Sequence, residues 1–137
     1  MNLTTMRCIV LCSVGIALSM AALAAQEGAQ RPRTRAEFMR MKLEYSKKVL
    51  EGLTMENYET IFKNARGLKT LSEAAEWEVR TIPNVGEYIV FTTEFQRLTD
   101  ELAKKAREKN MDGATLAYLR LTMNCVNCHK YVRQVSK

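Results

Sequence analysis

DGATLAYLRLTMNCVNCHKYVRQV, residues 112–135, carries apolar or half-apolar side chains at spacings of three and four along its whole length. That period places them on one stripe of an α-helix, and no two-residue alternation of a strand competes with it. The segment therefore predicts a long amphipathic helix that turns this stripe toward a core. The stripe consists of Ala114, Tyr118, Leu121, Cys125, Cys128, His129 and Val132.

The same helical period recurs upstream, and only two prolines, Pro32 and Pro83, interrupt the chain. Thr34 followed by Glu37 has the spacing of a capping box at a helix start. Thr54 and Asp112 are candidate N-caps, and Gly52 is expected near the end of the first helix. We expect helices over residues 34–51, 55–79, 87–109 and 112–135, with the segment 81–86 as the break between the second and third. Short connections predict an all-α, antiparallel, up-down-up-down four-helix bundle.

The first 25 residues have the pattern of a secretion signal. Arg7 precedes the uncharged apolar run 8–23, and Ala22-Leu23-Ala24 is a small-x-small cleavage site. The alternative is an uncleaved anchor, because residues 8–25 approach the lower length for spanning a membrane. We expect residues 1–25 to be a cleaved signal, 26–33 a flexible N-terminal segment and 34–137 one domain in the periplasm.

The last helix contains Cys125-Val126-Asn127-Cys128-His129, a C-x-x-C-H sequence that includes the only histidine of the chain. This is the attachment signature of c-type haem: two thioethers hold the porphyrin, and the histidine is an axial ligand of the iron. Zinc is an alternative, but the mature chain has no fourth Cys or His. Thiol-redox chemistry is another, although it does not need the histidine. One haem c, bound covalently inside the bundle, is the predicted cofactor.

The sixth position of the iron needs a second residue, and methionine is the usual choice when no second histidine exists. In an antiparallel bundle, the end of the last helix lies beside the start of the first, so Met39 and Met41 remain on positional grounds. Met39 shares the apolar face of its helix and is preferred; Leu43 is the alternative distal residue. A purely structural methionine is the other interpretation. Candidates to line the haem pocket are Phe38, Met39, Leu43, Leu71, Trp77, Tyr88 and Phe91.

Three basic residues are candidates to contact haem propionates. Arg35 lies one turn before Met39, and Arg133 lies one turn after His129. Lys42 falls on the apolar face of the first helix, where it either meets a propionate or extends its ammonium outward to water. For each of them, an ordinary solvated charge is the alternative.

The formal net charge is +6, or +5 without Arg7. A positive surface can steer docking to acidic partners. Charges of both signs nevertheless alternate along the helical faces, as on any soluble helical protein. No block of Lys and Arg with interleaved aromatics indicates nucleic acid.

In these residues the chain resembles the cytochrome c′ family, the class II c-type cytochromes. C-x-x-C-H near the C-terminus, Arg133 four positions after the histidine, and the Arg35–Met39 spacing carry the resemblance, which spans residues 34–137. It implies a four-helix bundle and two alternative behaviours. One is five-coordinate iron that binds nitric oxide or carbon monoxide. The other is a methionine-ligated electron carrier. It also implies a homodimer through the first two helices as a candidate assembly.

The sequence therefore predicts a periplasmic single-haem electron carrier that serves unidentified redox partner proteins. A gas-binding protein with five-coordinate haem is the alternative. An enzyme is disfavoured, because no distal histidine or other clear general base is available.

Overall fold

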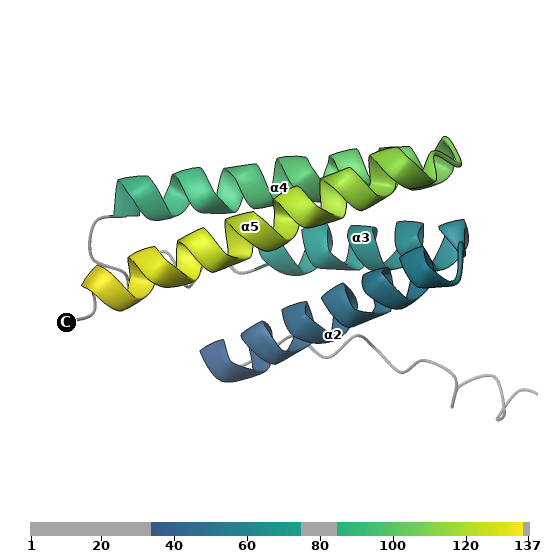
Figure 1. Ribbon diagram of the computed structural model, residues 1–137. Coiled ribbons are helices and arrows are strands. Elements are labelled where there is room, and N and C mark those ends of the chain that lie inside the picture. Colours follow the sequence, from purple (N-terminus) through teal and green to yellow (C-terminus); the bar gives the residue numbers. More distant parts are fainter. Residues whose placement is uncertain (1–33, 75–84, 136–137) are drawn as a thin grey trace, which may run out of the picture. The chain divides into compact units, whose positions relative to one another are not determined.

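The computed structural model describes residues 34–74 and 85–135, and within these ranges it is entirely helical. The four helices are α2 (Arg35–Thr54), α3 (Tyr58–Glu73), α4 (Val85–Arg107) and α5 (Met111–Val135). Consecutive helices run in opposite directions (Figure 1). The all-α prediction is confirmed, and the arrangement agrees with a four-helix bundle.

Several predictions fall outside the described residues. They are the signal at 1–25, the segment 26–33, the end of the second predicted helix with Trp77, and most of the 81–86 break. Among the helices that the structure does describe, none has both the length and the apolar character needed to cross a membrane.

The start of α2 follows the sequence closely. The Thr34 hydroxyl accepts a hydrogen bond from the Glu37 N–H (3.2 Å), and the Glu37 carboxylate accepts one from the Thr34 N–H (3.3 Å). Both donors would otherwise be unpaired at a helix start. The predicted capping box is therefore confirmed.

The turns after α2 and α4 are built alike, and both correct the predicted boundaries. Glu56 (φ 50°) and Lys109 (φ 52°) are in the left-handed conformation. The next residue, Asn57 or Asn110, donates its backbone N–H to the carbonyl five residues earlier, at 2.8 and 3.0 Å respectively, which is the Schellman ending of a helix. Helix α2 consequently continues through Gly52 to Thr54.

The same two asparagines start the following helices. The Asn57 side chain accepts from the Thr60 N–H (2.9 Å), and the Asn110 side chain accepts from the Gly113 N–H (2.8 Å). The predicted caps Thr54 and Asp112 were therefore wrong. An asparagine side chain that follows a left-handed residue satisfies the first turn of the next helix directly.

The main core occupies the half of the bundle near these two turns. Its buried members are Val49, Ile61, Ala65, Leu68, Phe95, Leu98, Leu102, Ala103, Ala106, Ala114, Ala117 and Leu121. Gly52 is buried here. The position has no room for a side chain, because a Cβ would lie 2.9 Å from Ile61 Cγ1. Helix α2 packs mainly on α3 and only slightly on α5. Among the four helix pairs that pack substantially, the least extensive contact is thus the one between α2 and the helix that carries the C-x-x-C-H sequence.

Candidate functional site

The C-x-x-C-H sequence lies on α5, in the half of the bundle away from the two turns. Cys125 and Cys128 are half-buried, and His129 is exposed. All three line a groove of about 50 Å³ to which α2 and α4 also contribute. The groove is lined by Met39, Lys42, Tyr88, Phe91, Thr92, Phe95, Asn124, Cys125, Cys128 and His129.

The predicted inward stripe of α5 is partly wrong. The buried residues are Ala114, Ala117, Leu121, Asn124 and Tyr131, at spacings of three, four, three and seven, with the half-buried Cys128 between the last two. Cys125 and His129 lie to one side of this seam, so they border the groove, whereas the seam itself packs on the other helices. The hydrophobic period was read correctly, but the buried seam is rotated toward Ala117 and Asn124 and away from Cys125 and His129.

Helix α4 supplies the aromatic wall of the groove. Tyr88, Phe91 and Phe95 recur at spacings of three and four, so one face of α4 carries all three. The rings of Phe91 and Tyr131 lie 5.7 Å apart. The buried Asn124 side chain donates a hydrogen bond to the Phe91 carbonyl (3.0 Å). That bond fixes α4 against α5 one residue before Cys125.

The Lys42 ammonium lies over two aromatic rings. Its Nζ is 4.6 Å from the Phe38 ring centroid and 4.2 Å from that of Phe95. These are cation–π contacts, which the negative ring faces favour. The structure therefore brings Lys42 to the groove wall, and its side chain follows the rings instead of extending straight into water.

The thiol of Cys125 is shielded from water. Burial raises its pKa, and the positive charge of Lys42 opposes this effect only in part. A thiol with a raised pKa is a weak nucleophile in disulfide exchange, since the thiolate is the reactive form. The electrostatics at Cys125 therefore do not favour thiol-redox chemistry.

Helix α2 brings Met39 into the groove together with the C-x-x-C-H residues. Met39 and Met41 both pack against the buried pair Phe38 and Leu71, but Met41 is not among the residues that line the groove. Leu43 is 55% exposed, so its prediction as a distal or pocket residue was wrong.

Of the predicted pocket residues, Met39, Tyr88 and Phe91 line the groove, whereas Phe38 and Leu71 lie in the adjacent cluster behind Met39. Arg35 and Arg133 are exposed and are not part of the groove lining. Their proposed contact with propionates remains a prediction.

Three groove residues were not singled out from the sequence: Thr92, Phe95 and Asn124. Asn124 is polar and was passed over, although it continues the spacing of Ala114, Ala117 and Leu121. A strict heptad count along α5 would have placed it in the seam.

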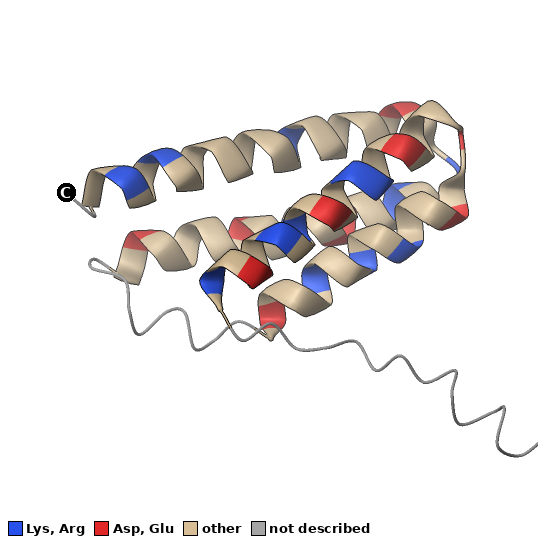
Figure 2. Ribbon diagram, turned by 90° about the horizontal axis from the view of Figure 1, so that it is seen from below, with Lys and Arg blue, Asp and Glu red and all other residues tan. Residues whose placement is uncertain are grey.

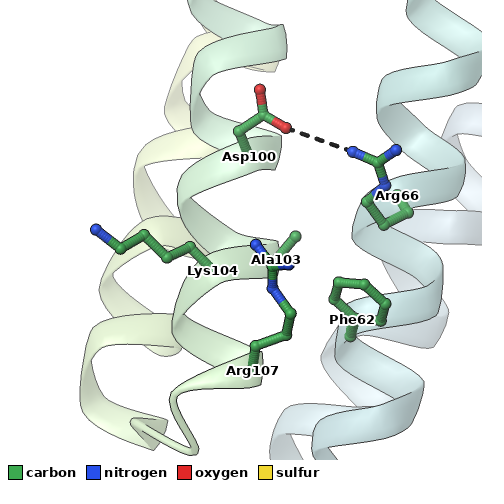
Figure 3. A pocket seen from close by; sticks show the side chains of 6 residues that line it. All are labelled: Phe62, Arg66, Asp100, Ala103, Lys104 and Arg107. Atoms are coloured by element: carbon green, nitrogen blue, oxygen red, sulfur yellow. Dashed lines mark ion pairs between the residues drawn. The ribbon is translucent and has the colours of Figure 1, made fainter.

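A second, larger cavity of about 480 Å³ lies between α3 and α4, away from the cysteines. Figure 3 shows its lining, with the ion pair between Arg66 and Asp100 (3.8 Å) across its mouth. The Arg107 guanidinium lies 5.5 Å from the Phe62 ring centroid. One salt bridge and one cation–π contact thus join side chains that line this cavity. None of the residues predicted to bind haem lies there.

The residues of the groove fit a covalently bound haem. Two thiols three positions apart project from one helix with a histidine directly after them, beside three aromatic side chains that can cover a porphyrin. Among residues 34–74 and 85–135, no group of three His, Cys, Asp or Glu side chains is arranged to hold a metal ion. The histidine would supply the ligand from the protein, and the porphyrin nitrogens would supply the others.

Comparison of the chain with models of known protein families, with curated proteins and with solved structures found no match.

Proposed function

We propose that the mature chain is an exported c-type cytochrome of the cytochrome c′ type, with one covalent haem on α5, and that it carries electrons. The observation that carries the proposal is that Cys125, Cys128 and His129 line one groove together with the aromatic face of α4 and with Met39 of α2. The haem supplies a one-electron couple when bound. The chain supplies attachment, ligation and exclusion of water.

Each residue has a separate role in this proposal. Cys125 and Cys128 form the two thioethers, which fix the group on a rigid helix. His129 ligates as neutral imidazole through one ring nitrogen. Tyr88, Phe91 and Phe95 cover apolar surface and exclude water, which is one way a protein sets a redox potential.

The first experiment tests attachment. The full chain, expressed in a host with haem-attachment machinery, should have the mass of the processed polypeptide plus one haem, and a c-type absorption spectrum. Replacing both Cys125 and Cys128 by Ala should abolish the covalent haem. The matched control replaces Cys8 and Cys12, which lie in the signal and should not affect it. Colourless protein with the mass of the bare polypeptide would refute the proposal.

The second experiment tests electron carriage against gas binding. Met39 lines the groove and Met41 does not, so the two methionines form a matched pair. With Met39 as sixth ligand, Met39→Ala should change a six-coordinate, low-spin spectrum to a five-coordinate one, and Met41→Ala should leave it unchanged. A weak far-red band in the oxidised protein should disappear with Met39.

Two other outcomes would reassign the distal side. If the iron of Met39→Ala stays low-spin, Lys42 becomes the candidate for the sixth ligand, because it is the other α2 residue that lines the groove and can ligate. Lys42→Ala would test this assignment. A wild-type protein that is already five-coordinate and binds carbon monoxide rapidly in the ferrous state would favour the gas-binding alternative.

A further inference from the structure

Helix α5 has a second apolar stripe, on the side opposite its buried seam. Leu116, Leu119, Met123 and Val126 are exposed by 57%, 57%, 56% and 41%. Their spacing of three, four and three residues places them on one narrow face of the helix. Exposed apolar side chains are normal when single, but a contiguous row along one helix indicates an interaction surface.

Two opposite charges bracket this stripe on the same face. Asp112 lies four residues before Leu116, and Lys130 lies four residues after Val126. Both are exposed, and neither belongs to any of the ion pairs between described residues. In Figure 2, α5 is mostly tan along its length, with basic residues in blue near its C-terminal end.

The stripe is complementary to itself when reversed. Leu116 and Val126 are equally distant from residue 121, as are Leu119 and Met123, and so are Asp112 and Lys130. Suppose that the exposed faces of two copies of α5 meet antiparallel, with the level of residue 121 along the helix axis as the midpoint. Leu116 then meets Val126, and Leu119 meets Met123, of the other copy. Asp112 then meets Lys130 at both ends. These are the alternating layers of an antiparallel coiled coil, with ion pairs that fix the register.

The surroundings of the stripe are compatible with such a contact. Arg120 lies near the crossing point, where two like charges would repel. Its guanidinium is, however, paired with Glu101 of α4 at 3.0 Å. The other neighbours of the stripe are small or polar and uncharged, namely Thr115, Thr122 and Asn127.

We propose that the chain forms a two-fold symmetric dimer through the exposed face of α5, with the two α5 helices antiparallel and centred at residue 121. A two-fold axis uses the same patch on both copies, and the patch must therefore be self-complementary. This interface differs from a dimer through the first two helices, which the resemblance implies. It does not depend on haem binding, so the two proposals fail separately.

Sedimentation velocity of the mature protein, with or without bound haem, over a range of concentrations tests the dimer. The wild-type protein should change from monomer to dimer as concentration rises. Leu119→Glu, which places a charge at the centre of the stripe, should leave only monomer. Leu43→Glu on α2 is the matched control, since Leu43 is equally exposed but lies outside the interface. It should behave like wild type.

The charged ends test the register. Asp112→Lys and Lys130→Asp should each raise the dissociation constant of the dimer by about tenfold or more, because like charges then face each other at both ends. The double variant should return it to near the wild-type value. A monomeric wild-type protein at all concentrations would overturn the proposal. So would dissociation by Leu43→Glu but not by Leu119→Glu, or a double variant weaker than either single one.

Discussion

The two ends of the bundle are filled by different side chains. Near the two turns, Ala103 and Ala106 of α4 pack with Ala114 and Ala117 of α5, and all four are almost fully buried. Around the C-x-x-C-H sequence, α4 presents large aromatic rings and a groove remains between the helices. Small side chains let helices approach closely, whereas large rings keep them apart. The chain completes its own core at the turn end, and in our proposal the haem completes the other.

The largest effect should come from a cavity at the turn end. Leu102 is fully buried, so Leu102→Ala should lower the free energy of unfolding by about 3 kcal/mol. Because Leu102 does not line the groove, the loss should be the same in haem-loaded and haem-free protein. Urea unfolding followed by circular dichroism measures both.

Phe91→Ala is the counterpart at the motif end. Phe91 is half-buried and faces the groove, so its loss should matter more when a haem covers the ring than when none does. Equal losses with and without haem at Phe91 would contradict the division of the bundle into a self-filled and a ligand-filled end.

The next largest effect on stability should come from replacing two glycines by alanine, one in a crowded position and one in open space. In α2, a Cβ at Gly52 would lie 2.9 Å from Ile61 Cγ1 and 3.1 Å from the Ile61 backbone nitrogen. At Gly86 in the first turn of α4, nothing lies within 4 Å of such a Cβ. We expect Gly52→Ala to destabilise by about 1–2 kcal/mol despite the better helix propensity of alanine. Gly86→Ala should stabilise by up to about 1 kcal/mol.

Thermal unfolding of the two glycine variants compares the ends of the bundle directly. Opposite signs would show that the turn end has no spare volume. If Gly52→Ala were neutral, the α2–α3 contact would be looser than the distances indicate.

The sequence predicted most of the fold because the hydrophobic period and the Thr34–Glu37 capping box are local signals. It failed at the two turns for a physical reason. Glu56 and Lys109 occupy the left-handed conformation, which is usually signalled by glycine. The only glycine near the first turn, Gly52, is instead required inside α2 by the close approach of Ile61. No local pattern reveals that tertiary requirement.

At the candidate site, the sequence predicted a chemistry for α5, which stays a prediction, but not all of the residues around it. The C-x-x-C-H spacing is a property of the sequence, so this motif could be found without knowledge of the fold. The groove residues of α2 depend on how that helix is rotated about its axis. Lys42 lies at the groove, as its place on the apolar face allowed, whereas Leu43 was assigned to the pocket and is exposed. Asn124 was missed because it is polar, although its bond to the Phe91 carbonyl is what makes its burial acceptable.

The smallest predicted effects concern helix caps, and they compare the two ends once more. Asn57 caps α3 inside a turn that joins two packed helices, whereas Thr34 caps the exposed start of α2. Replacing either by Ala should cost about 1 kcal/mol, with the larger share at Asn57.

Hydrogen exchange distinguishes the two cases. In Thr34→Ala, exchange should accelerate only in the first turn of α2, because this helix end can fray without disturbing the core. In Asn57→Ala, the buried amides of both α2 and α3 should exchange faster, since the turn holds the two helices together next to the Gly52–Ile61 contact. Asn57→Ser, which keeps a capping oxygen, should restore most of the protection. If Asn57→Ala affected only the first turn of α3, the turn end would be no more cooperative than the end that carries the groove.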